Sequence, residues 1–408
     1  MVLAALSFYA SPTDARELKV GTNSQFKTIQ AAIDSIPSDN KERVVIVISN
    51  GIYPEPLRIN NSFITLRGED RKKTRITAVI DTNSCQTSPD QSKEEHCSVI
   101  VADGHDLVFE NFTVENSFHS FSGKGAALSA VEDSTHILVH NVDVIGYGGD
   151  TFVLSARRNR IGDGGEYYVN DVYVSGTYHI IVPRGTTYVV NSSFWCLGGE
   201  KNCLFAEGVT RETDKFVVKD SIIDGPEPFG LGSYFRDAAW YFVNDTFGRN
   251  LLPDGRIHRE PAKNYKMKWG EGRIYFAGSK GLAYPWLANN FQQSPAKTPS
   301  TVTAQWVFPE WNPESSGGPK IQRLTTSPGE IAIVFSEAVT VDGEPRLILS
   351  SGFARYISGS GTDTLRFQTS KNYHPIGLEL NGGAIFASGA SLHQRNADLT
   401  LSPEHQPK

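Results

Sequence analysis

The feature that most restricts the fold of this chain is a short sequence pattern that recurs along it. Each copy places β-branched and aromatic residues at alternating positions around an Asn or Asp, and copies follow one another at intervals of about 20–30 residues. The copies are Phe109–Val114, Val139–Val144, Tyr168–Tyr173, Val189–Phe194, Val217–Ile222 and Phe242–Phe247. Alternation turns one side of each strand inward, and stacking neighbours buries that side. The pattern predicts an all-β chain built as a right-handed parallel β-helix.

The polar residue inside each copy predicts how the rungs are connected. An Asn stacked over another Asn can satisfy turn backbone groups along a solenoid. We expect parallel strands from about Ile46 to about Phe276. An antiparallel sandwich is the alternative, and it is disfavoured because no tight two-residue turns join the copies. The residues expected at equivalent turns are Asn111, Asn141, Asn170 and Asn191.

Composition narrows the possible partners. The chain has 408 residues, 39% of them hydrophobic, and a net charge of −6 with Lys and Arg spread along its length. Nucleic-acid binding needs a concentrated basic face, so no nucleic-acid partner is expected. No later segment approaches the length that crosses a bilayer, so no membrane partner is expected either. We expect a monomer that needs no cofactor.

The N-terminus and the cysteines point to export. Residues 1–15 begin with an apolar run that ends in small residues, which is typical of a signal peptide although the basic start is missing. A buried strand is the alternative. Cys85 and Cys97 are close in sequence, as are Cys196 and Cys203, which predicts two disulfides in a secreted or periplasmic protein. Four separate thiols are the alternative; zinc is disfavoured because no paired C-x-x-C spacing is present.

Several segments together resemble one enzyme family. Gly149–Phe152 and Gly176–Ile181 are similar to the two active-site strands of pectinesterases (carbohydrate esterase family 8), which read Q-D-T-L and G-T-x-D-F-I-F-G. Leu231–Phe235 stands where that family has L-G-R-P-W, and Trp311–Pro313 resembles its W-x-P. A helix predicted by the spacing of apolar residues in 29–36, followed by Gly51–Glu55, resembles the opening of the family's catalytic domain. The resemblance covers residues 19–313.

The resemblance implies ester hydrolysis on pectic polysaccharide. In the family one carboxylate attacks the ester, a second transfers a proton, an arginine keeps the nucleophile ionised and two glutamines stabilise the oxyanion. Transferred by position, the proton-transfer residue is Asp150, the nucleophile position is His179 and the arginine position is Ser233. The two glutamine positions are Gly125 and Gly149, which leaves only backbone N–H groups there.

Three hypotheses fit these substitutions. The first is a catalytically inactive pectinesterase-like protein that binds an acidic polysaccharide. The second is a rebuilt hydrolase in which Ser233, His179 and Asp150 form a nucleophile–base–acid relay. In the third, the alignment to the family motif is shifted by some residues, and Asp163 or Asp171 serves as the second carboxylate. The segment Ser175–Thr177 argues against this shift, because it fixes the alignment.

Other side chains are candidates for contact with substrate. Tyr147 and Phe235 are expected to stack on sugar faces, or else to pack between rungs. Arg184 is expected to meet a galacturonate carboxylate, as are the arginines at 157, 158 and 160, although arginines more often only face solvent. An Asp–His metal site lacks a third ligand in the sequence, so no metal is expected.

The composition changes after Pro313. Residues 314–319 have the content of a linker, and residues 320–402 contain short strands separated by Gly-rich turns. The phrase Phe335–Gly343 resembles immunoglobulin-like modules appended to secreted bacterial proteins. We expect a small β-sandwich that serves as a spacer or binds carbohydrate.

Overall fold

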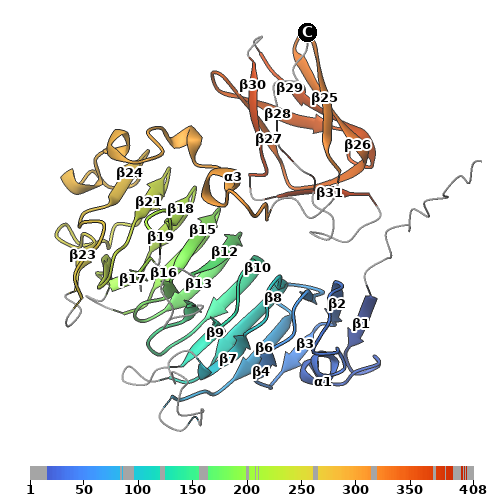
Figure 1. Ribbon diagram of the computed structural model, residues 1–408, viewed down its shortest axis with the longest axis vertical. Coiled ribbons are helices and arrows are strands. Elements are labelled where there is room, and N and C mark those ends of the chain that lie inside the picture. Colours follow the sequence, from blue (N-terminus) through green and yellow to red (C-terminus); the bar gives the residue numbers. More distant parts are fainter. Residues whose placement is uncertain are drawn as a thin grey trace, which may run out of the picture.

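A computed structural model of the chain shows two β-rich parts, a long solenoid and a smaller C-terminal sheet (Figure 1). Residues 1–15, the predicted signal peptide, lie outside the part that it describes, as does most of the predicted linker. The described residues are 16–82, 85, 96–119, 125–155, 164–198, 202–206, 208–209, 211–260, 265–313, 319–370, 374–381, 383–388, 397, 399 and 401.

Parallel strands of the solenoid form two long sheets, and the prediction of a right-handed parallel β-helix is confirmed. Sheet A has 16 strands and sheet B has 8, and along the chain strands of sheet A alternate with strands of sheet B. Sheet A contains β1 (Arg16–Val20), β2 (Val44–Ile48), β3 (Gly51–Tyr53), β5 (Ile64–Gly68), β6 (Thr74–Ala78), β8 (Val108–Asn116), β10 (Ile137–Ile145), β12 (Gly165–Asn170), β13 (Tyr173–Gly176), β15 (Gly185–Val190), β16 (Ser193–Cys196), β18 (Phe216–Lys219), β19 (Ile222–Asp224), β21 (Trp240–Val243), β22 (Thr246–Phe247) and β24 (Ile274–Ala277). Sheet B contains β4 (Leu57–Ile59), β7 (Ser98–Ala102), β9 (Ala126–Ala130), β11 (Phe152–Leu154), β14 (Ile181–Pro183), β17 (Asn202–Ala206), β20 (Gly230–Tyr234) and β23 (His258–Arg259).

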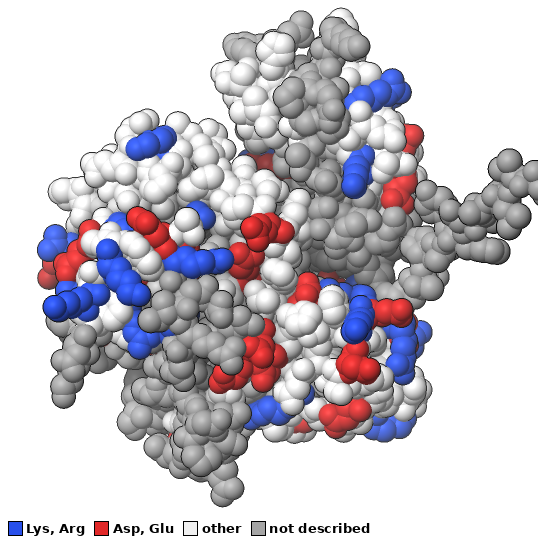
Figure 2. All heavy atoms as spheres, in the orientation of Figure 1, with Lys and Arg blue, Asp and Glu red and all other residues white. Residues whose placement is uncertain are grey.

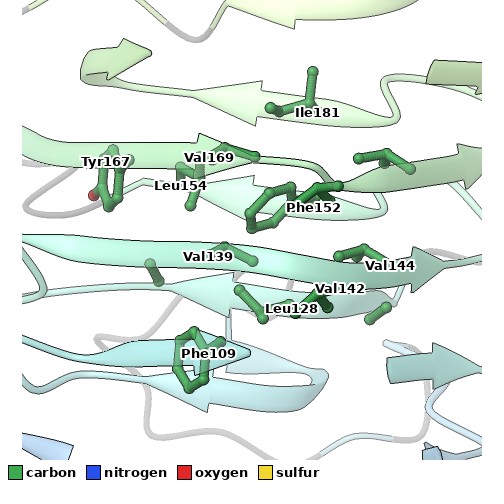
Figure 3. Packing of buried hydrophobic residues seen from close by; sticks show 14 of the residues in the cluster. Phe109, Leu128, Val139, Val142, Val144, Phe152, Leu154, Tyr167, Val169 and Ile181 are labelled. Atoms are coloured by element: carbon green, nitrogen blue, oxygen red, sulfur yellow. The ribbon is translucent and has the colours of Figure 1, made fainter. Parts of the chain in front are cut away.

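The core of the solenoid lies between these two sheets, where side chains of one type stack above one another. Leu128, Phe152 and Ile181 are partners on three successive rungs of sheet B, and all are fully buried (Figure 3). Val139 and Val169 are partners on sheet A opposite them. Because each rung packs only on its neighbours, the repeated apolar alternation is enough to build this core.

A column of residues in the left-handed backbone region marks one turn of each rung. Its members are Asn111, Asn141, Asp171, Asn191, Asp220 and Asn244, with φ between 50° and 61°. The predicted Asn ladder is therefore confirmed at three of its four positions and wrong at Asn170. The register pairs Asn170 with His140 and places Asp171 at the turn. Asn and Asp tolerate this backbone region better than other non-glycine residues.

The solenoid is closed at its first rung by helix α1 (Ile29–Asp34). Glu55, the last residue of the predicted G-x-Y-x-E motif, accepts hydrogen bonds from the backbone N–H groups of Ile29 (2.9 Å) and Gln30 (3.0 Å). A carboxylate at a helix N-terminus satisfies free donors and complements the helix dipole. The motif therefore fixes the helix that covers the open end of the sheet.

After β24 the chain runs back over the outer face of sheet A. This return segment contains η1 (Pro285–Leu287), η2 (Phe291–Gln293), η3 (Pro299–Thr301) and α3 (Ala304–Val307). Phe291, Val307 and Phe308 pack on Tyr168, Tyr188 and other outward residues of sheet A. No helix in the described part of the chain has the length and apolar character needed to cross a membrane.

The C-terminal part is a 7-stranded sheet whose strands pair antiparallel. Its relation to immunoglobulin-like modules stays a prediction. An ion pair joins it to the solenoid, because Glu379 Oε1 lies 3.3 Å from Lys219 Nζ. The strands are β25 (Ile321–Ser327), β26 (Glu330–Asp342), β27 (Arg346–Leu349), β28 (Phe353–Ser358), β29 (Thr362–Gln368), β30 (Pro375–Glu379) and β31 (Ala384–Ala387).

Candidate functional site

Asp150 and His179 stand together at the start of two adjacent sheet B rungs. Because Phe152 pairs with Ile181, the register places Asp150 beside His179, and the same register places Asn202 beside His179 on the next rung. The N–H of His179 donates to the carbonyl of Asn202 at 3.1 Å. Asp150, His179 and Asn202 therefore form a column along the stack.

The two predicted catalytic side chains contact each other. Asp150 Oδ1 lies 3.4 Å from His179 Nδ1, so the imidazole presents Nδ1 to the carboxylate. His179 has a φ of 48°, and its ring stacks on Tyr178 with centroids 3.6 Å apart. This left-handed backbone and the stacked ring together fix the direction of the imidazole.

The two side chains differ in how far a substrate can reach them. The Asp150 side chain is 20% exposed, whereas that of His179 is 10% exposed and its Nε2 atom is shielded from solvent. A base must come within hydrogen-bond distance of the proton that it removes. In this arrangement Asp150 is the reachable group and His179 lies behind it.

Ser233 does not join this pair. It lies in β20, two rungs beyond the rung of His179, which is a separation of about 10 Å along the stack. Its side chain is fully buried, and within the described residues its Oγ atom has no hydrogen-bond partner. The hypothesis of a Ser233–His179–Asp150 relay is therefore wrong for this arrangement, because strand register separates the hydroxyl from the imidazole.

The two glycines predicted at oxyanion positions have different surroundings. A Cβ atom on Gly125 would lie 2.3 Å from the carbonyl oxygen of Ile80, and Asn116 Nδ2 donates to the Gly125 carbonyl at 2.6 Å. Glycine at 125 is thus explained by close packing. Gly149 is half-buried next to Asp150. An oxyanion role for either backbone N–H stays a prediction.

Apolar and aromatic residues lie on the outer face of sheet B. Val153 and Val182 are partners on adjacent rungs and point away from the core, because successive strand residues alternate between faces. Ala126 joins them, and Phe235 packs against this small cluster, whose three members are 0–5% exposed and therefore covered. Phe235 thus packs on neighbouring rungs, and the Arg236 guanidinium lies 5.1 Å from the centroid of its ring; its stacking on a sugar stays a prediction.

Of the other predicted contact residues, Tyr147 lies near the surface and Arg184 does not. Tyr147 stacks on the exposed His119 with ring centroids 3.9 Å apart. Burial, helped by Glu115, raises the pKa of the Tyr147 phenol. Arg184 is only 6% exposed, so the expectation that it meets a substrate carboxylate is not supported. The arginines at 157, 158 and 160, and the residue at 163, lie outside the described residues.

Sequence reasoning missed a second carboxylate near the column. Asn202 Nδ2 donates to Glu260 Oε1 at 3.3 Å, and His258 Nε2 lies 3.9 Å from the same oxygen. Burial raises the pKa of the Tyr178 phenol, and the charges of Glu260 and Asp150 raise it further. The Tyr178 phenol is therefore less acidic than an exposed tyrosine. Nothing in the local sequence signals this, because Glu260 arrives from a distant rung.

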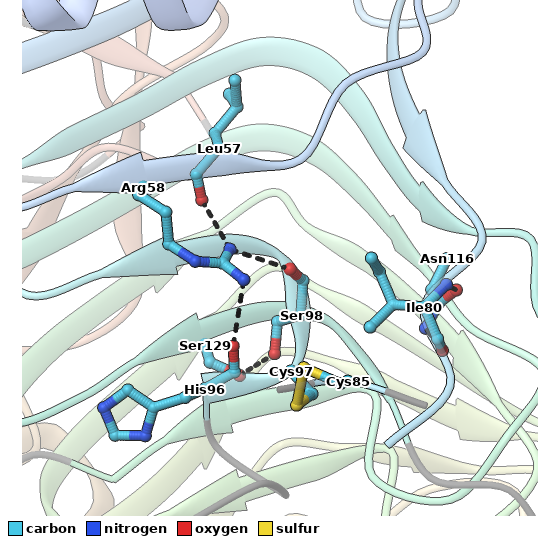
Figure 4. Close-up of a disulfide and its surroundings, with 9 residues drawn as sticks. All are labelled: Leu57, Arg58, Ile80, Cys85, His96, Cys97, Ser98, Asn116 and Ser129. Carbon is cyan, nitrogen blue, oxygen red and sulfur yellow. Dashed lines mark hydrogen bonds between the residues drawn. A yellow bond between two sulfur atoms is a disulfide. The ribbon is translucent and has the colours of Figure 1, made fainter. Parts of the chain in front are cut away.

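The rungs that precede Asp150 in the chain contain a disulfide and a polar network (Figure 4). Cys85 is bonded to Cys97, and the second predicted bond, between Cys196 and Cys203, is also present. Next to Cys97, the hydroxyls of Ser98 and Ser129 lie 2.5 Å apart. The Arg58 guanidinium donates to the carbonyls of three residues, Leu57, His96 and Ser98.

Charges of both signs are interspersed over the face of the solenoid that Figure 2 shows. The described residues contain no group of three or more His, Cys, Asp or Glu side chains arranged to hold a metal ion. The Asp150 column offers a carboxylate that can accept a proton and an amide that can donate a hydrogen bond.

Comparison with known proteins agrees with the architecture. Residues 18–215 match the model of the pectinesterase family. The chain is 28% identical over 184 residues to pectinesterase 31 of Arabidopsis thaliana, a match that spans 41% of this chain and about half (52%) of that relative.

Solved structures show the same fold at low sequence identity. Pectin methylesterase PemA from Erwinia chrysanthemi is similar with a TM-score of 0.56 and 18% identity, over 74% of this chain and 98% of the other. A pectin methylesterase in complex with a hexasaccharide is similar with a TM-score of 0.50 and 17% identity, over 72% of this chain and 97% of the other.

Proposed function

We propose that this chain, which matches the pectinesterase model over residues 18–215 and shares the fold of pectin methylesterases, acts on pectic polysaccharide as a carboxylic ester hydrolase. The polymer would bind where the Asp150 side chain reaches the surface, and one of the similar structures is a pectin methylesterase in complex with a hexasaccharide. The observation that carries the proposal is the Asp150 carboxylate, whose side chain is 20% exposed and contacts His179.

In the proposed reaction Asp150 acts as a general base. Its carboxylate takes a proton from a water molecule, whose oxygen attacks the ester carbonyl to give a tetrahedral intermediate. The C–O bond to the alcohol then breaks, and the alcohol leaves with the proton that Asp150 returns. The products are the alcohol and a carboxylic acid, which ionises in water. No covalent enzyme intermediate is needed, which suits a chain with His at the nucleophile position.

The neighbours of Asp150 have supporting roles. His179 orients the carboxylate through Nδ1 and is a positioning residue, because its other nitrogen is covered. The amide of Asn202, one rung beyond His179 and two beyond Asp150, is a side-chain donor in the same column that an extended substrate could reach. Phe235 and Tyr147 offer rings on which sugar faces can stack.

Binding without hydrolysis is the second candidate function, and one observation favours it. Ser233 Oγ and His179 Nε2 are both covered, so neither atom can act on a bound ester in this conformation. A chain in which Asp150 is also inert would be a glycan-binding protein of the pectinesterase fold.

The test is the release of methanol and of acetate from esterified pectin by the wild-type chain and by Asp150→Asn. We expect Asp150→Asn to lower release by about 10²–10⁴-fold, the usual contribution of a general base. Asp39→Asn, at an exposed position in the N-terminal region, is the matched control and should behave as wild type. If the wild type releases neither product yet binds pectin, the glycan-binding function replaces the hydrolase.

We also propose that the chain works in an oxidising compartment as a secreted or periplasmic monomer. Two disulfides support the oxidising compartment, because cytosolic thiols are kept reduced. A chain that is folded and active only in an exported, oxidised form would agree with the proposal, whereas full activity of a reduced cytosolic form would contradict it.

A further inference from the structure

The C-terminal sheet carries a pocket in which two arginines flank an exposed aromatic ring. Phe353, the first residue of β28, is 44% exposed. The Arg346 guanidinium on β27 lies 4.8 Å from the centroid of its ring, and Arg355 follows two positions later on β28. A cavity of about 440 Å³ opens there, lined by Glu344, Pro345, Arg346, Phe353, Arg355 and Tyr356.

The two arginines form an unfavourable pair in the absence of a ligand. Arg346 and Arg355 are direct cross-strand partners, and like charges at such positions repel each other. In the described part of the chain neither guanidinium takes part in an ion pair. Repulsion of this kind is relieved when an anion lies between the two groups.

The carboxylate best placed to neutralise Arg346 is engaged elsewhere. Glu379 on β30 is the other cross-strand partner of Arg346, but its Oε1 atom pairs with Lys219 of the solenoid at 3.3 Å. Glu344 is the remaining carboxylate at the pocket, and it offsets only one of the two positive charges. The junction between the two parts of the chain therefore leaves the pocket with an excess of positive charge.

The pocket also restricts the shape of the anion. The exposed Phe353 ring offers aromatic surface, on which the apolar face of a sugar ring packs. Guanidinium groups pair with carboxylates through two parallel hydrogen bonds. A ring that carries a carboxylate satisfies both features at once, whereas a neutral sugar leaves the arginines unpaired.

We propose that Arg346, Phe353 and Arg355 form a second glycan-binding site, on the C-terminal sheet, which takes a uronate-bearing oligosaccharide. The site is separate from the Asp150 column and binds the acidic, de-esterified form of the polymer. The choice of galacturonate as the probe rests on the proposed function, while the presence of an anionic-sugar site does not. De-esterified stretches of the product would thus keep the chain attached near esterified stretches of its substrate.

The experiment is calorimetric titration of the full chain with a short galacturonate oligomer and with its fully methyl-esterified counterpart. We expect the acid form to bind more tightly, and binding to weaken at high ionic strength. Arg346→Gln and Arg355→Gln should each weaken binding of the acid form by about tenfold, since each loses a charge-assisted contact. Phe353→Ala should weaken binding of both forms. The matched control is Arg323→Gln, an exposed arginine on β25 outside the pocket.

A measurement of melting temperature distinguishes a loss of binding from a loss of folding in these variants. Arg355→Gln removes the repulsion from Arg346, so its melting temperature without ligand should equal or exceed that of the wild type. If the double variant Arg346→Gln, Arg355→Gln is folded and binds the acid oligomer as tightly as wild type, the site is disproved. Equal binding and full competition by a sulfated polysaccharide or by single-stranded nucleic acid would overturn the uronate assignment.

The outcome is distinguishable from a failure of the proposed function. Asp150→Asn should lower ester release by about 10²–10⁴-fold and leave oligomer binding at the C-terminal site unchanged. A wild type that releases no ester, but whose oligomer binding depends on Arg346 and Arg355, would reject the hydrolase and retain the C-terminal site.

Discussion

Asp150 Oδ1 lies 3.4 Å from His179 Nδ1, and it is the carboxylate of this pair that faces solvent while the imidazole is covered. In a nucleophile–base–acid relay the order is the reverse, with the imidazole between the acid and the substrate. The difference in burial therefore makes Asp150 the candidate for contact with substrate and His179 the residue that positions it.

Replacing His179 should lower turnover without weakening binding. His179→Ala removes the Nδ1 contact to Asp150, and a misplaced catalytic group can cost about 10²-fold in rate. His179→Asn keeps an N–H donor and tolerates the left-handed backbone, so it should recover part of the lost kcat. Ester-release kinetics should show a fall in kcat with little change in KM. His374→Asn, at an exposed position on the C-terminal part, is the control. A change confined to KM would contradict a positioning role.

Ser233→Ala should leave ester release unchanged within about twofold, because the hydroxyl lies about 10 Å along the stack from the rung of His179. The same change removes a buried hydroxyl that has no hydrogen-bond partner in the described structure, so the free energy of unfolding should stay the same or rise. Parallel activity and denaturation measurements check both statements. A loss of activity comparable to that of Asp150→Asn would restore the relay hypothesis.

The turn column should be sensitive to the loss of Asn141. Its Nδ2 donates to Asn111 Oδ1 at 2.7 Å, and its Oδ1 accepts from Arg71 at 3.0 Å, at a φ of 51°. Asn141→Ala should lower the free energy of unfolding by about 2–3 kcal/mol, because it loses hydrogen bonds and strains the backbone. Asn141→Gly relieves the strain and should cost about 1 kcal/mol less. Equal losses in the two variants, by denaturant unfolding, would exclude a backbone contribution.

The stability of the solenoid should fall as the pH rises through neutrality. Burial raises the pKa of Glu110 from its usual 4.5 to about 7, although Arg67 and Arg43 oppose the shift. Because the folded-state pKa is the higher one, the folded state binds more protons between about pH 4.5 and pH 7. The stabilisation is therefore complete below the unfolded-state pKa and is lost as pH rises through the folded-state pKa.

Unfolding by denaturant at pH 5 and pH 8 measures this loss, and Glu110→Gln should reduce it. His136 adds a loss in the same direction, because a hydrogen bond to Asp106 raises its pKa. The difference between wild type and Glu110→Gln isolates the contribution of Glu110. An identical pH dependence in both proteins would show that Glu110 stays ionised in the folded state.

The sequence by itself determined the features that depend on local chemistry or on a repeated spacing. The alternation of apolar residues predicted the stacked rungs, because each rung packs only on its neighbours. Proximity in the chain predicted the Cys85–Cys97 and Cys196–Cys203 bonds, and both are present. The pairing of Asp150 with His179 followed from their places in adjacent repeats, since parallel rungs bring equivalent positions together.

Only the tertiary structure decided which residue occupies each turn of the solenoid and which side chains from distant segments come into contact. Asn170 and Asp171 are adjacent polar residues, and the register of β10 with β12 put Asp171 at the turn. The spacing of rungs kept Ser233 from His179, and the distant Glu260 arrived beside Asn202. At the junction, Lys219 took the carboxylate that Arg346 would otherwise use. Contacts of this kind depend on strand register and on which distant segments pack together. The residue pattern within one segment determines neither of these.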